Sequence, residues 1–242
     1  MVRPKIAMKV LALSLAALFV TACSGLSGEE KLERSTAHYQ LGVSYLNENN
    51  IQPAFVEFQK SLEYNPDNKE TLNAVGLIYL LKLDDYPKAV EFFQKAIKQD
   101  ENYAEAWNNL GSAYEKVGKF SNAVEAYKTA LKNPFYRNAE KAFYNLGRAY
   151  YRMGKFNDAV ESYTESIRRY SDFYPPYYGL ALSYNALRRY GDAATALKKA
   201  LELDPNYKGD KEKAIKDLND KRLLVRGDEM KDLDDLLEIM NY

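Results

Sequence analysis

The chain has 242 residues, of which 46% are hydrophobic and 28% charged, a composition that excludes a wholly disordered chain and a membrane protein with many spans. Lys plus Arg equals Asp plus Glu at 34 each, so no overall basic charge indicates a nucleic-acid partner. A single Cys and a single His leave little material for metal sites, disulfides or acid–base chemistry.

Residues 1–22 have the pattern of a secretory signal peptide. Three positive charges precede an apolar run from Val10 to Val20, and small residues follow it. The run of 11 residues is shorter than the roughly 20 needed to cross a bilayer as a helix. We therefore expect this segment to be removed after export.

The segment ends in Val20-Thr21-Ala22-Cys23, which resembles the lipobox of bacterial lipoproteins. The resemblance implies that Cys23 is acylated and becomes the first mature residue. Each buried methylene of an acyl chain contributes about 0.8 kcal/mol, so two or three chains form a lasting anchor. Ser24 after the lipobox implies delivery to the periplasmic face of the outer membrane of a Gram-negative bacterium. A conventional signal peptide with an incidental Cys, or an uncleaved hydrophobic anchor, are the alternatives.

Residues 24–34 include Gly25, Gly28 and two Ser, a composition that favours a flexible coil. As a coil they would span roughly 17 to 20 Å. Together with Cys23 they form an expected lipidated tether over residues 23–34, which would keep the folded part close to the membrane.

A motif of about 34 residues repeats through the chain. Each copy has a leading aliphatic residue, a small residue 13 or 14 positions later and a large one four further on. The leading residues are Leu41, Val75, Leu110, Leu146 and Leu180, with spacings of 34, 35, 36 and 34. The small residues are Ala54, Ala89, Ala123, Ala159 and Ala193, and the large ones are Phe58, Phe93, Tyr127, Tyr163 and Leu197.

These residues resemble the tetratricopeptide repeat. The third copy carries the whole signature, Trp107-x2-Leu110-Gly111-x2-Tyr114 followed by Ala123-x3-Tyr127. The resemblance implies an all-α superhelical solenoid of five helix-turn-helix repeats over residues 35–207. We place the repeats at residues 35–68, 69–103, 104–139, 140–173 and 174–207.

The helical period supports the same fold. At 100° per residue, His38, Leu41, Gly42 and Tyr45 share one face of the first helix, which we expect to pack inward. Because Gly42 and Ala54 are small, the two helices of this repeat can approach to about 8 to 10 Å.

Residues 208–242 depart from the repeat and predict C-terminal capping helices. Ala214 and Leu218 indicate a helix that covers the last repeat. Gly227 and Asp228 then indicate a stop and a new start. The final helix combines an apolar stripe with many carboxylates, so it is either a further cap or a docking helix.

The sequence contains no pattern typical of an enzyme. A glycine-rich phosphate loop and a His-Glu zinc motif are both missing from the 242 residues. His38 stands where other repeats have Trp107 and Phe143, which favours a structural role. We expect no catalysis, cofactor, metal, small-molecule substrate or nucleic-acid partner.

The first helix of each repeat lines the concave groove in tetratricopeptide proteins, so its side chains opposite the packing face are candidate partner contacts. The predicted groove residues are Tyr39, Val43, Leu46, Leu77, Leu80, Leu81, Tyr144, Arg148 and Tyr151. They make the groove apolar in the first two repeats and aromatic and basic in the fourth. Such a surface suits an amphipathic helix or an extended apolar peptide. Packing of Leu77, Leu80 and Leu81 within the chain is the alternative.

A lipobox, a short tether and five repeats in this length resemble the type IV pilus biogenesis lipoproteins of the pilotin family (PilF, PilW and Tgl). The most specific stretch runs from Asn133 to Gly147, although Arg137 stands where Pro is usual. The resemblance implies a lipoprotein that binds secretin subunits and promotes their localisation or multimerisation. Two rivals stay open, a BamD-like subunit of the barrel-insertion machinery and an NlpI-like adaptor for cell-wall hydrolases or proteases.

Overall fold

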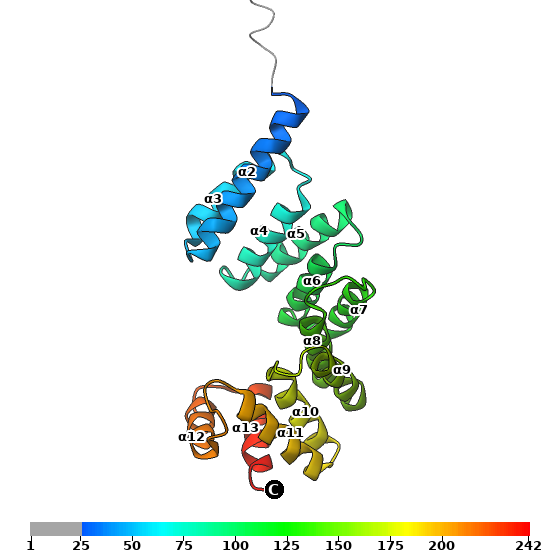
Figure 1. The fold of residues 1–242 in the computed structure, drawn as a ribbon, viewed down its shortest axis with the longest axis vertical. Helices are drawn as coiled ribbons and strands as arrows, with labels where there is room; N and C mark the ends of the chain where they lie inside the picture. The colour runs from blue at the N-terminus through cyan, green and yellow to red at the C-terminus, as the bar shows by residue number, and fades with distance from the viewer. Residues whose placement is uncertain (1–25) are drawn as a thin grey trace, which may run out of the picture. The chain divides into compact units, whose positions relative to one another are not determined.

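The structure is a computed structural model that describes residues 26–242, which form twelve α-helices and contain no β-strand. The predicted signal peptide and Cys23 lie outside the described residues. The chain divides into two compact units, Met1–Thr71 and Leu72–Tyr242, and each is described by itself (Figure 1).

The first unit contains α2 (Gly28–Asn47), α3 (Ile51–Tyr64) and the first residues of α4 (Lys69–Leu81). Helix α2 starts earlier than expected because Ser27 caps it. The Ser27 hydroxyl accepts from the Glu30 N–H at 3.2 Å, and the Glu30 carboxylate accepts from the Ser27 N–H at 2.8 Å, a reciprocal capping box. Residues 28–34 are therefore helical, which corrects the flexible coil expected for them.

Three buried hydroxyls form a polar contact inside the first unit. Ser61 lies between Ser35 and Thr71, with Oγ–Oγ and Oγ–Oγ1 distances of 3.0 and 2.8 Å. All three side chains are completely buried. Because each hydroxyl has a partner, their burial avoids the cost of an unsatisfied polar group.

Leu41 departs from the expected inward packing, since it is 43% exposed whereas Leu110, Leu146 and Leu180 are buried. In the second unit, the first helix of a repeat packs against the second helix of the repeat before it. Among residues 26–242 no helix precedes α2, so Leu41 has no such helix to contact.

The second unit continues with paired helices. They are α5 (Tyr86–Gln99), α6 (Ala104–Lys116), α7 (Phe120–Leu131), α8 (Ala139–Arg152), α9 (Phe156–Arg169), α10 (Pro175–Ala186) and α11 (Tyr190–Leu203). Helices α6 and α7, α8 and α9, and α10 and α11 form hairpins, and α5, α7 and α9 also pack on the helix that follows each of them (Figure 1). This arrangement confirms the predicted all-α solenoid.

A glycine facing an aromatic ring sets the contact between the two helices of a repeat. A Cβ added to Gly111 would lie 2.5 Å from Cε1 of Tyr127, closer than van der Waals contact. The equivalent glycines of the first, second and fourth repeats meet Phe58, Phe93 and Tyr163 in the same way. The fifth repeat has Ala181 in place of the glycine and Leu197 in place of the aromatic residue. The extra methyl group of the alanine is therefore accommodated by a smaller side chain opposite it.

Two helices follow the last repeat, α12 (Lys211–Arg222) and α13 (Asp228–Ile239). Ala214 and Leu218 of α12 are buried in the main hydrophobic core of the second unit. Helix α13 contacts α10, α11 and α12, and its Leu236 and Ile239 join the same core. The final helix thus packs on both helices of the fifth repeat, α10 and α11.

Candidate partner-binding surface

The three groove residues predicted in the first unit all lie on α2 and are half-buried. They are Tyr39, Val43 and Leu46. The ring of Tyr39 lies 6.0 Å from that of Phe58, so part of its surface packs within the unit. These side chains offer a partly apolar surface rather than a fully open one.

The three leucines predicted on α4 have different environments. Leu81 is 62% exposed, Leu77 is half-buried and Leu80 is only 4% exposed. The prediction that Leu80 lines an accessible groove is therefore wrong. Residues 71–76, Ile78 and Leu80 are all buried, so α4 is covered around most of its circumference, as a helix that is apolar on several sides must be.

The predicted residues of α8 do lie close together. The Arg148 guanidinium sits 5.7 Å from the centre of the Tyr144 ring, and the rings of Tyr144 and Tyr163 are 6.1 Å apart. Tyr151, one turn beyond Arg148, belongs with both to the lining of a pocket of about 190 Å³. The aromatic and basic character expected for the fourth repeat is therefore gathered in one place.

A buried carboxylate stands behind Arg148. Nη2 of Arg148 lies 3.3 Å from Oε2 of Glu115, whose side chain is only 9% exposed. The other oxygen, Oε1, is buried without a hydrogen-bond partner. Burial raises the pKa of Glu115, and the charge of Arg148 partly opposes this. Arg148 thus neutralises an internal charge and is not a free cation of the groove.

The end of α8 contacts α13 through side chains. The Tyr151 hydroxyl donates to Oδ1 of Asp232 at 3.1 Å, and Arg152 forms an ion pair with the same carboxylate. Two of the chain's own helices therefore meet where we predicted a contact for an external partner.

Side-chain amides join successive repeats along the first helices. Asn109 of α6 donates to Asn73 of α4 at 2.9 Å, and Asn145 of α8 donates to Asn108 of α6 at 3.2 Å. The fifth repeat has Gly179 at the donor position, so this kind of bridge cannot form there. The amides hold neighbouring repeats in register from the second repeat to the fourth.

His38 has a structural environment. Its Nδ1 lies 2.6 Å from Oε2 of Glu57, and its ring stacks on Tyr64 at 5.5 Å. Lys60 donates to the other oxygen of Glu57 at 2.7 Å. These hydrogen bonds, that of Lys60 first, lower the pKa of Glu57. His38 and Glu57 therefore join α2 to α3, which favours a structural role for the histidine over a catalytic or metal-binding one.

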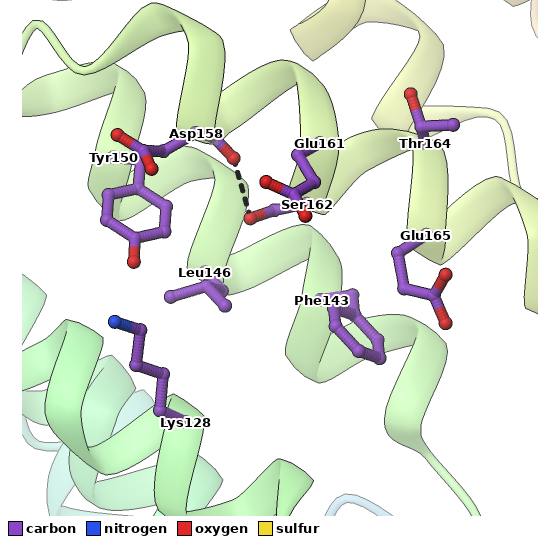
Figure 2. Close-up of a pocket in the computed structure, with 9 residues that line it drawn as sticks. All are labelled: Lys128, Phe143, Leu146, Tyr150, Asp158, Glu161, Ser162, Thr164 and Glu165. Carbon is purple, nitrogen blue, oxygen red and sulfur yellow. Dashed lines mark hydrogen bonds between the residues drawn. The ribbon is translucent and has the colours of Figure 1, made fainter.

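A cavity of about 680 Å³ lies among α7, α8 and α9 (Figure 2). Its wall includes Lys128 and Glu165. Hydrogen bonding to Arg168 lowers the pKa of Glu165, and hydrogen bonding to Tyr150 raises that of Lys128. Both groups therefore stay charged near neutral pH, where a proton-transfer catalyst would need a pKa close to the working pH.

Within residues 26–242 no three His, Cys, Asp or Glu side chains are grouped so that they could hold a metal ion. Over the same residues no helix combines the length and the apolar character that a membrane crossing needs.

The helical wheel places Glu115 on the groove side of the third repeat, but sequence reasoning did not pair it with Arg148, nor Asp232 with Arg152. A signal for Asp232 was present, since Asp228, Asp232 and Asp235 fall on one face of a helix and Arg148 and Arg152 are one turn apart on α8. The burial of Glu115 had no signal in the sequence, because a carboxylate on a solenoid helix is ordinarily solvated.

Sequence profiles described as tetratricopeptide repeat match four stretches of the chain. The matched residues are 35–68, 80–118, 104–133 and 144–208. They cover parts of all five predicted repeats.

Among curated proteins, the type IV pilus assembly protein PilF of Pseudomonas aeruginosa is 28% identical over 105 residues, which are 43% of this chain and 41% of PilF. The solved structure of PilF superposes with a TM-score of 0.65 and 23% identity over 84% of this chain and 98% of that one. The chain spans less than two thirds of the length of the curated relatives it matches, for example 10% of anaphase-promoting complex subunit 3 of Schizosaccharomyces pombe.

Two further solved structures share the fold. PilW, described as a widely conserved type IV pilus biogenesis factor, has a TM-score of 0.65 and 22% identity over 81% of this chain and 96% of its own. MamA has a TM-score of 0.61 and 27% identity over 74% of this chain and 96% of its own. The repeats, the paired helices and these likenesses agree that the chain is a tetratricopeptide-repeat protein, similar to PilF in sequence and to PilF and PilW in fold.

Proposed function

We propose that the protein is a lipid-anchored pilotin that assists the outer-membrane localisation and multimerisation of the type IV pilus secretin. The observation that carries the proposal is the likeness to PilF, in sequence over 105 residues and in fold over 84% of the chain. The lipobox-like ending at Cys23 supports the anchor. In this proposal the anchor places the solenoid at the membrane, and the solenoid holds a segment of the secretin before assembly.

The apolar contact for the secretin is proposed at the end of α4. Leu81 and Leu83 are 62% and 53% exposed there, and half-buried Leu77 lies one turn before Leu81 on the same helix. Exposed leucines in proximity are typical of a surface that another protein covers. Since Leu80 is buried, it has no part in the proposed contact.

Leu81→Glu should weaken capture of the secretin by about tenfold, the size of effect expected for a central apolar contact. Because Leu81 is exposed, the helical content and the unfolding midpoint should stay unchanged. The measurement is co-purification and binding of secretin by the full exported chain. Leu224→Glu is the matched control, since Leu224 is 83% exposed in a different part of the chain. Equal capture by the two variants would remove α4 from the proposal.

Cys23→Ser should release the protein from the membrane, because a serine cannot carry the thioether-linked lipid and one apolar run is too short to span. The measurement is fractionation of cells that produce the variant, together with acyl labelling of the parent chain. Heat-stable secretin multimers should fall in the same cells. Loss of general barrel assembly or of cell-wall turnover, with secretin multimers intact, would instead favour the BamD-like or the NlpI-like function.

A further inference from the structure

Helix α13 is an amphipathic helix seated on the groove side of the fourth and fifth repeats. Its apolar stripe includes the buried Leu236 and Ile239 and packs into the core with α10 and α11. Its acidic side reaches α8, where Asp232 accepts from Tyr151 and pairs with Arg152. A helix with one apolar and one acidic side therefore covers part of the surface formed by α8, α10 and α11.

The charges on the two sides are complementary. Asp228, Asp232 and Asp235 lie within about 60° of one another around α13. On α8, Glu115 pairs with Arg148. Arg152 is therefore available to pair with Asp232 of α13. Removal of α13 would leave Arg152 and the Tyr151 hydroxyl free to bind another carboxylate in the same geometry.

The seat is incompletely filled. A pocket of about 190 Å³ and another of about 380 Å³ lie beside α13, and both include Tyr151, Arg152 and Asp232 in their walls. The connection from α12 is exposed, with Leu223 and Leu224 at 72% and 83%. Arg222 pairs with Asp234, which lies about 200° around α13 from Asp232. Helix α13 can therefore stay tied to α12 when its groove side is free.

We propose that α13 is a displaceable internal occupant, and that the groove of α8 and α10 receives an acidic amphipathic helix of a partner protein in its place. The partner helix carries one carboxylate for both Arg152 and Tyr151, further carboxylates about one turn away on the same face, and leucines one position later on its apolar side. This inference rests on the scaffold function proposed above and adds to the secretin contact of α4 a second binding site, for a segment of different chemistry.

The test uses the full chain and a synthetic peptide of residues 226–242 as the probe. Asp232→Lys places a cation against Arg152 and should release α13, which exposes the core residues that Leu236 and Ile239 contact. Hydrogen exchange of the α13 amides should become at least about tenfold faster. The labelled peptide should bind this variant at least about tenfold more tightly than it binds the parent chain, because the internal competitor is gone.

Three controls separate displacement from damage. Glu229→Lys makes the same charge change on an exposed residue of α13 and should behave as the parent chain. Adding Arg152→Glu to Asp232→Lys restores an ion pair with reversed signs, and should return both the exchange rate and the peptide affinity to parental values. A peptide with Lys at positions 228, 232 and 235 should not bind Asp232→Lys.

Slow exchange of α13 in Asp232→Lys, no gain in peptide affinity, or equal binding of the charge-reversed peptide would each overturn the inference and leave α13 as a fixed cap. The test contains no secretin, so its failure leaves secretin capture through Leu81 standing. Conversely, loss of the secretin function leaves the result with the peptide unaffected.

Discussion

Replacing Gly111 by Ala should destabilise the protein by about 1 to 3 kcal/mol, the usual cost of adding a methyl group to a close-packed contact. The new Cβ would lie 2.5 Å from Cε1 and 2.7 Å from Cδ1 of Tyr127, whose side chain is fully buried and cannot turn away. The loss outweighs the gain of up to about 1 kcal/mol that Ala brings to a helix in place of Gly. Urea unfolding followed by circular dichroism measures the difference.

The matched control is Gly191→Ala in α11, where an added Cβ meets nothing within 4 Å. This variant should be neutral or stabilised by up to about 1 kcal/mol. A double variant, Gly111→Ala with Tyr127→Leu, reproduces the pair Ala181 and Leu197 of the fifth repeat. Its destabilisation should be smaller than the sum of the two single effects. Additive effects would show that the ring does not set the helix contact.

Replacing Arg148 by Met should destabilise the protein by about 2 kcal/mol at pH 8, because Glu115 is then a buried charge without compensation. The effect should shrink as the pH falls. Burial already holds the folded-state pKa of Glu115 above its ordinary value against the pull of Arg148, and loss of Arg148 raises it further. The folded state then binds the proton more tightly than the unfolded state.

The sign of the pH dependence follows from this difference. The free energy of unfolding of Arg148→Met is highest below the ordinary Glu pKa, and it falls as the pH rises through the raised folded-state pKa. Urea unfolding from pH 4 to pH 8, compared with the parent chain, measures it. Adding Glu115→Gln should remove the extra pH dependence. A difference between Arg148→Met and the parent that is constant with pH would show that the loss comes from packing of the Arg side chain instead.

The repeats can be predicted from the sequence because the residues that pack within each repeat recur at fixed spacings. The five alanines that follow the leading aliphatic residues are completely buried, and so are the aromatic rings of Phe58, Phe93 and Tyr127. These contacts lie within one repeat, so spacing alone locates them. The early start of α2 also had a local signal, the capping box of Ser27 and Glu30, which the two neighbouring glycines obscured.

The surface of the groove was harder to predict, because it depends on contacts between distant segments. A helical wheel places Leu80 and Leu46 at equivalent angles, yet Leu80 is buried and Leu46 is half-buried. The wheel reports direction, whereas burial depends on what lies in that direction. In the same way, the amphipathic pattern of α13 predicts a helix that packs somewhere, but the contact of Asp232 with Arg152, 80 residues earlier, requires the folded chain.

The glycine and the ring that face each other in the first four repeats come from the same repeat, residues 42 and 58 in the first and residues 111 and 127 in the third. Each of these four repeats therefore carries its own gauge of interhelical distance. A gene that gains or loses one whole repeat keeps this gauge intact, so the length of the solenoid can evolve in complete steps without the core being redesigned.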